Sequence, residues 1–575
     1  MVHLSPKCIA FILILLIHQK ITPMVYQPKD NEIKWWQKTC IYQIYPRSYM
    51  DSDNDGIGDI DGIISKLDYI HETGFETIWI SPFYKSPQQD FGYDISDYYS
   101  IAPEYGTLEK VEKLIGEVHK RGMYIVFDMV MNHTSIEHHW FHESRSSIDN
   151  PKRNWYIWRD GKGKNRPPNN WKAMIGGSGW QYDKFTNQWF WASFLPFQPD
   201  LNYHNPEVKK TMLDMVRYWL GKGVDGFRLD IFNAIFKDQS FKNNPFSFRP
   251  LPSENNSNGF FQNFKYTVNH QMDFEFAKEL RSVIDEFSQP ERFLVGEVFG
   301  KDDVIKQYLG EKQDGLNLIF LFEMLRFKFN AAFFRKALLK YEKFYPYPYV
   351  PTYVFSNHDR IRSIFNVGNN VEKARLLATF QFMARGVPTN YMGEEIGMHE
   401  SNFKLKEARD SLAKKYSWIP QWLVDLVGPY LNRDGCRTPM QWDTTMNAGF
   451  SASKNGTWLP VNECYKTINV QTELADSNSL LNTFRKLIAV RKSNKAIECG
   501  VLKVIETKHS KVLAFTREYE NEKILIMINF SKKHFHLKHP LPGLNNILFS
   551  AGNAMVHDDI ISLPQVSAII LKNQR

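Results

Sequence analysis

Short runs of β-branched and aromatic residues alternate along the chain with longer stretches in which apolar residues recur at helical spacing. The helical stretches include 63–73, 107–121 and 206–222. Repeated alternation of strand and helix predicts an α/β fold of the (β/α)8 TIM barrel type, with parallel strands each followed by a helix. The eight predicted strands are 41–45, 77–81, 124–130, 226–232, 293–298, 316–322, 353–356 and 389–392.

Three intervals between these elements are too long for a simple connection. Residues 132–203 follow the third strand and are rich in Trp, Asn, Gly and Pro, which predicts an inserted subdomain over the barrel mouth. A polar insertion at 245–259 follows the fourth strand, and a third insertion at 399–479 follows the eighth. From about residue 500 short alternating strands predict a small C-terminal antiparallel β-sandwich.

The first residues have the pattern of an export signal. Lys7 precedes an apolar run at 8–17 that is too short to span a bilayer as a helix. We expect a secreted, extracellular protein without a membrane span, and a membrane anchor is the competing interpretation. The predicted organisation is a signal peptide at 1–23, the first part of the barrel at 35–131, inserted subdomain B at 132–203, the second part of the barrel with its late insertion at 204–499, and the β-sandwich domain at 500–575.

Charge and composition exclude some classes of partner. The chain has 71 Lys and Arg against 63 Asp and Glu, a net charge of +8, and no basic block, which gives little support to nucleic-acid binding. Aromatic residues make up 15% of the chain, which indicates a large folded core. We therefore expect a small-molecule partner, no nucleic acid, and a monomer or homodimer.

Cysteines and glycan acceptor sequons are consistent with export. Five cysteines are too few for a disulfide framework in a chain of 575 residues, and loss of Cys8 with the signal leaves four, enough for one or two bridges. Sequons at Asn255, Asn455 and Asn529 predict a glycoprotein, whereas the sequon at Asn132 lies in a motif that we expect to be internal.

Polar residues gather where the predicted strands end. The carboxyl ends of barrel strands form the rim that carries the chemistry, so we expect these side chains to converge. They are Asp128, Asn132 and His133 after the third strand, Arg228 and Asp230 at the fourth, Glu297 at the fifth, and His358 and Asp359 at the seventh.

Three of these residues are carboxylates on different strands. Burying Asp230, Glu297 and Asp359 together is costly, because like charges raise one another's pKa and desolvation disfavours ionisation. Glycoside cleavage requires such a set, with one carboxyl that protonates the leaving oxygen and one carboxylate that attacks the anomeric carbon. Arg228 lies two residues before Asp230 on the same strand face, and we expect it to keep that carboxylate ionised.

Four ordered motifs resemble those of the alpha-amylase superfamily, also called glycoside hydrolase family 13. They are DMVMNH (128–133), GFRLD (226–230), GEV (296–298) and SNHD (356–359), and the resemblance extends from about residue 35 to the C-terminus. It implies that Asp230 is the nucleophile, Glu297 the acid/base and Asp359 the stabiliser of the transition state. It also implies that no organic cofactor takes part.

Further segments resemble the oligo-1,6-glucosidase, maltase and sucrose-hydrolase type of α-glucosidase: YQIYPRSY (42–49), FGYDISDY (91–98), QPDLN (198–202) and CRTPMQW (436–442). The implied activity is retaining, exo-acting hydrolysis of terminal α-linked glucose from maltose-, sucrose- or isomaltose-type sugars through a covalent glycosyl-enzyme. A pair formed by Asp94 and Arg437 is implied at the closed end of the pocket. The full set of implied substrate-binding residues is Tyr93, Asp94, His133, Arg228, His358 and Arg437.

Linkage preference stays open. Ile231 follows the nucleophile, where some relatives with α-1,4 preference carry Thr and α-1,6 types carry Val. Two alternative functions also remain. A glucosyl-transferring or isomerising relative shares the same first chemical step, and a non-catalytic glucosidase-like ectodomain or receptor shares only the fold.

The run DSDNDGIGD (51–59) has the spacing of a calcium loop, with Gly56 permitting a tight turn. Position twelve is Gly62 rather than Glu, which argues against a helix-loop-helix calcium sensor. The resemblance implies instead a structural Ca2+ in the loop after the first strand. An acidic surface turn without an ion is the alternative. The candidate ligands are the carboxylates of Asp51, Asp53, Asp55 and Asp59 and the carbonyl of Ile57.

Overall fold

The computed structural model describes residues 29, 32–163, 166–252, 256–427 and 429–573. The predicted signal peptide and the sequon at Asn255 lie outside the described residues. Within them, none of the helices is both long enough and apolar enough to cross a bilayer.

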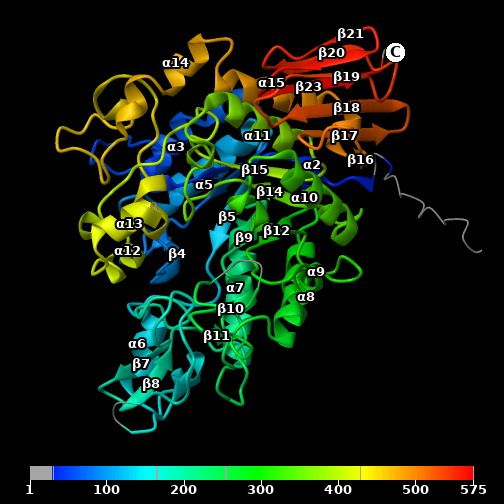
Figure 1. Cartoon of the computed structure of the whole chain (residues 1–575). Coiled ribbons are helices and arrows are strands. Elements are labelled where there is room, and N and C mark those ends of the chain that lie inside the picture. The colour runs from blue at the N-terminus through cyan, green and yellow to red at the C-terminus, as the bar shows by residue number, and fades with distance from the viewer. Residues whose placement is uncertain (1–28, 30–31, 164–165, 253–255, 428, 574–575) are drawn as a thin grey trace, which may run out of the picture.

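The centre of the molecule is a sheet of eight parallel strands that curves into a barrel (Figure 1). Apart from β13 and β14, each strand pairs with the next barrel strand along the chain, and the last strand returns to pair with the first. The fold class predicted from the sequence is therefore confirmed, and all eight predicted strands are present. They are β1 (Ile41–Ile44), β2 (Thr77–Ile80), β5 (Tyr124–Met129), β9 (Gly226–Leu229), β12 (Phe293–Gly296), β13 (Leu318–Ile319), β14 (Thr352–Val354) and β15 (Val387–Tyr391).

One seam of the barrel, between β13 and β14, is joined by a side chain rather than by a backbone ladder. In the described residues, the series of hydrogen-bonded strands begins at β13 and ends at β14, and the backbones of these two strands are not paired with each other. The buried hydroxyl of Thr352 donates to the carbonyl oxygen of Ile319 at 2.7 Å and accepts the backbone N–H of Leu321 at 3.0 Å. One hydroxyl thus satisfies a buried donor and a buried acceptor that the ladder leaves unpaired.

Helices surround the strands and pack their apolar residues against them. In α7 (Pro206–Gly221), Asn205 caps the first turn and Pro206 occupies the first helical position, while Val208, Met212 and Trp219 are buried. The predicted helix at 63–73 is two helices. The first begins earlier than predicted, because the side chain of Asp59 accepts the N–H of Gly62, and it ends where the backbone of Lys66 departs from helical geometry. The other barrel helices are α3 (Ile60–Ser65), α4 (Leu67–Thr73), α5 (Leu108–Lys120), α8 (Gln271–Asp285), α9 (Asp302–Leu309), α10 (Ala331–Phe344) and α11 (Val371–Met383).

The segment after β5 forms its own small unit. It contains α6 (His139–Ser146) and an antiparallel sheet of β6 (Trp158–Arg159), β8 (Gln188–Trp191) and β7 (Trp180–Asp183), in that order. Its apolar cluster is built from Ile157, Trp171, Trp180 and Trp191. The indole N–H of Trp171 donates to the carbonyl of Lys242 at 2.8 Å, which ties this unit to the loop after β9.

That loop carries the hairpin of β10 (Asn258–Gly259) and β11 (Gln262–Asn263), and another hairpin, β3 (Tyr84–Lys85) with β4 (Asp97–Ile101), follows β2. The segment after β15 carries α12 (Ser411–Lys415), α13 (Gln421–Val427) and α14 (Val470–Ala475). Three further short or late helices are α2 (Trp35–Lys38), α15 (Leu480–Lys492) and α16 (Lys495–Glu498).

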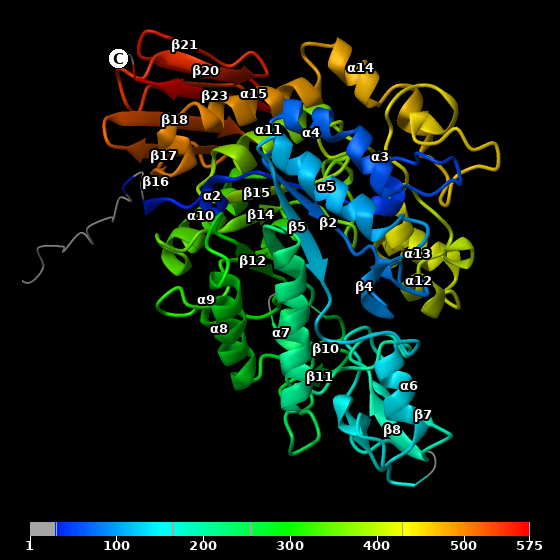
Figure 2. The same cartoon turned by 180° about the vertical axis from the view of Figure 1, so that it is seen from behind.

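The C-terminal part is a pair of antiparallel sheets, as predicted. Apolar residues such as Leu525, Ile561 and Ile569 fill the space between the sheets. Buried Arg517 reaches back to the barrel, where it donates to the carbonyl of Met383 at 2.9 Å. This part and the inserted sheet lie at opposite ends of the molecule (Figure 2). The strands are β16 (Val501–Ile505), β17 (Val512–Tyr519), β18 (Glu522–Asn529), β19 (Phe535–Lys538), β20 (Asn546–Ala551), β21 (Met555–His557), β22 (Ile560–Leu563) and β23 (Ser567–Lys572).

One predicted glycan site is wrong. Asn529 is fully buried, and its side-chain amide donates to the carbonyls of Lys533, Leu563 and Pro564. A glycan on that nitrogen would have no space in the folded sandwich. No disulfide joins the four described cysteines, Cys40, Cys436, Cys464 and Cys499.

We predict that Thr352→Val lowers the stability of the barrel by about 1–3 kcal/mol, because a buried N–H and a buried carbonyl lose their partner. Thr389→Val on β15 is the matched control, since the buried hydroxyl of Thr389 has no hydrogen-bond partner. Thermal melting should show a lower midpoint for Thr352→Val and an unchanged or higher one for Thr389→Val. Equal midpoints for the two variants would show that the seam hydroxyl contributes nothing.

Candidate active site

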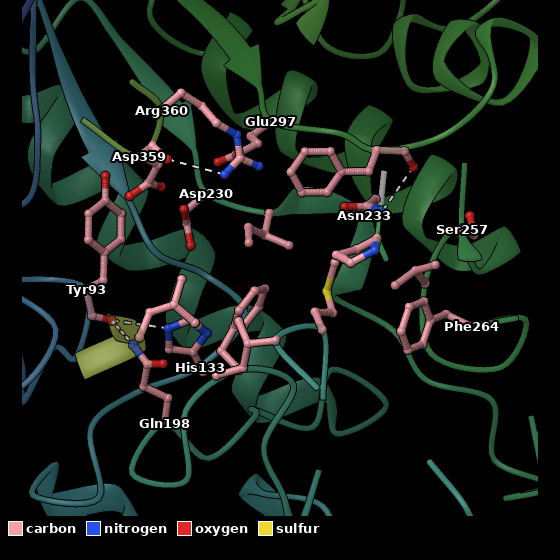
Figure 3. A pocket seen from close by; sticks show the side chains of 18 of the residues that line it. Tyr93, His133, Gln198, Asp230, Asn233, Ser257, Phe264, Glu297, Asp359 and Arg360 are labelled. Carbon is pink, nitrogen blue, oxygen red and sulfur yellow. Dashed lines mark hydrogen bonds between the residues drawn. The ribbon is translucent and has the colours of Figure 1, made fainter. Parts of the chain in front are cut away.

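A cavity of about 280 Å³ opens at the carboxyl ends of the barrel strands. Asp230, Glu297 and Asp359 line it, and Figure 3 shows all three side chains turned toward the same space. Asp230 directly follows β9 and Glu297 directly follows β12, while Asp359 lies in the loop after β14. The parallel register of β9 against β12 pairs Leu229 with Gly296, so the two carboxyls leave neighbouring strands at the same level.

One buried guanidinium connects the acidic residues. Nη1 of Arg228 donates to Asp128 Oδ1 at 2.8 Å and to Asp230 Oδ1 at 2.9 Å, and Nη2 donates to Glu297 Oε2. Arg228 is 1% exposed. Asp230 and Glu297 are therefore held on two nitrogens of a single side chain, which is the close approach that retaining glycoside cleavage requires.

Burial controls the protonation of this pair. Desolvation is the main effect that raises the pKa of Asp230 well above its usual range, and the charges of Glu297 and Asp128 add to it against the lowering effect of Arg228. Burial likewise raises the pKa of Glu297, again against Arg228. The pair therefore keeps a proton more readily than isolated carboxyls do, and supplies one acid and one base.

The pKa of Asp359 is lowered, in contrast to the raised pKa values of Asp230 and Glu297. Its Oδ1 accepts from Arg437 Nη2 at 2.6 Å and from Arg433 Nη1 at 3.0 Å. Burial raises the pKa of Asp359, but the guanidinium groups of Arg433 and Arg437 outweigh burial and hold this pKa well below its usual range. Asp359 is thus a carboxylate while the pair across the cavity holds a proton.

His358 and Tyr93 support the acidic group. Tyr93 Oη donates to Asp128 Oδ2 at 3.0 Å and lies 2.7 Å from His358 Nε2, and His358 Nδ1 lies 2.6 Å from Gln43 Nε2. The rings of Tyr93 and His358 are stacked, with centroids 5.3 Å apart. Burial lowers the pKa of His358 to about 3, so its imidazole is neutral.

His133 also lines the cavity, as predicted for a substrate-binding residue. Its Nε2 lies 3.1 Å from the carbonyl of Tyr93, and burial lowers the pKa of its imidazole. Asn132 and Asp200 form a separate buried group with Lys237, whose ammonium donates to Asn132 Oδ1 at 2.8 Å. Asn132 is fully buried, in agreement with the expectation that its sequon is internal.

The predicted pair of Asp94 and Arg437 is wrong. Asp94 turns away from the cavity, where it accepts the backbone N–H groups of Gln89 and Asp90, each at 3.0 Å, and the hydroxyl of Ser86 at 2.9 Å. Burial, and then the charge of Asp90, raises the pKa of Asp94 to about 7. Arg437 contacts Asp359 instead.

The pair at this end of the cavity is Asp90 and Arg433, with Arg433 Nη2 2.8 Å from Asp90 Oδ1. Both residues line the cavity, and Gln198 Nε2 donates to Asp90 Oδ2 at 2.9 Å. Asp90 precedes Asp94 by four residues and Arg433 precedes Arg437 by four. Both predicted members therefore lie four positions too late along the chain, and the motif spacing alone could not separate the two possibilities.

The other end of the cavity is lined by residues that the sequence motifs did not indicate, apart from Ile231. Ile231 has a left-handed backbone, with φ 39° and ψ 51°, a strained conformation for a β-branched residue. The N–H of the next residue, Phe232, donates to the carbonyl of Glu297 at 2.9 Å, so this turn links the two catalytic strand ends. The other lining residues at this end include Met174, Asn233, Ser257, Phe264 and Phe299.

The predicted calcium loop brings together three of its four candidate carboxylates. Carboxylate oxygens of Asp51, Asp53 and Asp59 lie within 4.8 Å of one another. Asp55 is outside this group and accepts the N–H of Ile57 at 2.7 Å. Three adjacent carboxylates repel one another unless a cation or backbone donors balance them, and hard oxygen donors suit Ca2+.

Comparison with known proteins identifies the family. The alpha amylase catalytic domain matches residues 43–500, and the maltogenic amylase C-terminal domain matches residues 502–554. The chain belongs to the alpha-amylase family. An oligo-1,6-glucosidase of Parageobacillus thermoglucosidasius is 39% identical over 526 residues, which cover 87% of this chain and 91% of the relative. An alpha-glucosidase of Apis mellifera is 36% identical, and the match covers 91% of this chain and 90% of that relative.

Solved structures in the alpha-amylase family give the same result. An alpha-glucosyl transfer enzyme has a TM-score of 0.85 and 33% identity, with 94% of this chain and 100% of that chain covered. The trehalulose synthase of Pseudomonas mesoacidophila MX-45 has a TM-score of 0.85 and 31% identity, with 94% and 99% covered. The chain is thus a glycoside hydrolase with the barrel and C-terminal sheets of this family.

We predict that Asp90→Asn weakens glucose binding roughly 10- to 100-fold, since it removes one charge-assisted hydrogen bond in the closed end of the cavity. Asp94→Asn should lower the melting temperature instead, because the amide NH2 would replace one of the two carboxylate oxygens and leave the backbone N–H bound there without an acceptor. Isothermal titration calorimetry and thermal melting separate the two effects. A large loss of glucose affinity in Asp94→Asn with none in Asp90→Asn would restore the pair that the sequence predicted.

Proposed function

We propose that the protein is a retaining, exo-acting α-glucosidase that removes terminal α-linked glucose from small sugars. The observation that carries this proposal is the position of Asp230 and Glu297 on one guanidinium, in a cavity whose end is closed by Asp90 and Arg433. A closed end admits a terminal glucose unit and blocks a longer chain from passing through.

The chemistry follows from the protonation states. Asp230 attacks the anomeric carbon while Glu297 gives its proton to the leaving oxygen, which breaks the glycosidic bond and forms a glucosyl ester on Asp230. Glu297, now a carboxylate, then takes a proton from water, whose oxygen displaces Asp230 and completes hydrolysis. The first half passes the proton of Glu297 to the leaving alcohol, and the second half returns a proton from water to Glu297, so the pair carries one negative charge beside Arg228 throughout the cycle.

Asp359 acts on the sugar rather than on the proton. Because Arg433 and Arg437 keep it ionised, it offers a fixed negative charge to hydroxyls and to the positive charge that develops on the ring in the transition state. Arg433 also contacts Asp90, so the closed end and the stabilising carboxylate are positioned by the same side chain. Neutral His133 completes the wall, and neutral His358 stacks on Tyr93, which also lines the cavity.

The relatives support hydrolysis of α-glucosides as the main activity. Several are oligo-1,6-glucosidases, others are alpha-glucosidases, and one is a trehalose-6-phosphate hydrolase of Bacillus subtilis. The structural neighbours favour a second candidate, transfer or isomerisation, since they include an alpha-glucosyl transfer enzyme and a trehalulose synthase. Both outcomes start from the same glucosyl ester and differ in whether water or a sugar hydroxyl attacks it.

Three further expectations are part of this proposal. The carboxylates of Asp51, Asp53 and Asp59 would hold one structural Ca2+, and Asp55 would remain outside it. The N-terminal pattern supports export to the extracellular space. The sequon at Asn455 lies on an exposed turn, which makes it the preferred glycan site among the described sequons.

The substrate test uses maltose, isomaltose, sucrose and trehalose separately, with products resolved by chromatography. An exo-acting hydrolase yields free glucose from at least one of them at early times. Products larger than or isomeric with the substrate, in excess over glucose, would favour the transferring or isomerising candidate.

We predict that Glu297→Gln slows maltose cleavage by about 10²–10⁴-fold, because the poor leaving group needs a proton. An aryl glucoside with a good leaving group should be affected far less in forming the glucosyl ester. Asp230→Asn should abolish turnover of both substrates while the far-ultraviolet circular dichroism spectrum stays unchanged. Equal slowing of both substrates by Glu297→Gln would contradict its role as proton donor.

We predict that millimolar Ca2+ raises the melting temperature of chelator-treated protein, since a ligand that binds only the folded state stabilises it. Asp53→Asn should remove most of this rise, and Asp55→Asn should leave it intact. Scanning calorimetry with and without Ca2+ measures both. The calcium site is rejected if the untreated and chelated proteins melt together at every Ca2+ concentration.

A further inference from the structure

The open end of the cavity lies opposite Asp90 and Arg433. In Figure 3, Tyr93 and Gln198 lie to the left of Asp230, and Asn233, Ser257 and Phe264 lie to the right. The first side is the closed end that takes the terminal glucose. The leaving group must therefore lie on the side of Ser257 and Phe264.

The cavity continues on that side into a shallow surface groove. Pro252 and Arg326 line both the catalytic cavity and the groove. We name this the apolar groove, and its other lining residues are Ser247, Phe248, Arg249, Pro250 and Leu251. A leaving group longer than one sugar ring would pass Pro252 and enter it.

The side chains at the apolar groove are unusually apolar for a solvent-exposed surface. Phe248 is 91% exposed and Leu251 is 71% exposed. Next to them, Phe246 and Phe261 are 66% and 51% exposed, with the Phe246 ring 5.0 Å from that of Phe248. Adjacent exposed apolar groups of this size mark a binding surface in soluble proteins, because water contact with them is unfavourable.

The apolar groove has a backbone frame. The N–H groups of Ser247 and Phe261 donate to the carbonyls of Phe261 and Arg249 at 3.1 and 2.8 Å. The N–H of Phe260 donates to the carbonyl of Pro250 at 3.0 Å. The segment is thus bonded to the β10–β11 hairpin over several residues, which fixes the exposed rings next to the cavity mouth before any ligand arrives.

We propose that the apolar groove binds an apolar aglycone, so that the enzyme favours α-glucosides with long alkyl leaving groups over those with small ones. This inference rests on the proposed α-glucosidase function. A second sugar would need fixed hydrogen-bonding partners for its hydroxyls, whereas the groove offers Phe, Leu and Pro surfaces with Ser247 and two arginines at its edges. Because the groove continues from the catalytic cavity at Pro252, its occupant is the part of the substrate that extends out of the cavity.

No new chemistry is needed for such a substrate. Glu297 protonates the oxygen of the departing alcohol, Asp230 takes the glucosyl group, and water releases glucose. The groove contributes only contact with the alcohol's hydrocarbon part, and this contact persists through the first transition state because the alcohol is still bound there.

The test compares n-octyl α-D-glucoside, below its micelle concentration, with methyl α-D-glucoside. Burial of about two methylene groups corresponds to roughly a tenfold higher kcat/KM for the octyl compound in the wild type. Phe248→Ala and Leu251→Ala should each lower kcat/KM for the octyl glucoside by about three- to tenfold, mainly through KM. Both residues are exposed, so folding is not at stake.

Phe185→Ala is the matched control, because Phe185 is 80% exposed and lies in the turn between β7 and β8, outside the groove. It should leave both substrates unaffected, and Phe248→Leu should retain most of the octyl preference. The methyl glucoside should be cleaved equally well by all variants.

Three results would overturn the inference. The first is no preference of the wild type for the octyl glucoside, and the second is an equal loss of kcat/KM for both glucosides in Phe248→Ala. The third is unchanged kinetics of Phe248→Ala together with a molecular mass in sedimentation below that of the wild type. The last result would assign the groove to self-association. Failure of the α-glucosidase function itself is distinguishable, because the wild type would then cleave neither the methyl glucoside nor maltose.

Discussion

The buried guanidinium of Arg228 faces three carboxylates, and this excess of negative charge determines what the site can do. One buried cation cannot neutralise all three of Asp128, Asp230 and Glu297. A proton must remain on the group, and a retained proton next to an ionised carboxylate is the requirement of acid-assisted glycoside cleavage. A second arginine, Arg433, acts in the same way at the closed end, where Asp90, Asp359 and Asp410 converge on it.

The barrel makes this concentration of charge possible. Parallel strands bring residues from positions 128, 230, 297 and 359 to one rim, and the hydrogen-bonded core beneath them is too well packed to let the rim relax. The inserted unit after β5, the hairpin after β9 and the segment after β15 then add the walls. Leu412 from the last of these and Met174 from the first both line the cavity, which explains why such long insertions follow these strands.

The strands and the catalytic carboxylates could be predicted because each of these residues ends a short apolar run, and strand ends on one rim must meet. The closed end could not, since two aspartates stand four residues apart in one motif, and which of them turns inward depends on the backbone donors at Gln89 and Asp90. The buried state of Asn529 and the exposure of Phe248 were equally unpredictable. Both depend on which sheet or loop covers the residue. From the sequence alone, the apolar residues around Phe248 could equally well have been part of the core.

Infrared spectroscopy of the carboxyl groups tests the central claim most directly. The account predicts that the wild type at neutral pH shows the C=O stretch of a protonated carboxyl that Glu297→Gln lacks, so that this band appears in the wild-type-minus-variant difference spectrum, because the variant has lost the protonated carboxyl and leaves Asp230 ionised beside Arg228. Other buried acids cancel in the difference. Identical spectra for the two proteins would show that the group around Arg228 holds no proton and would contradict the account.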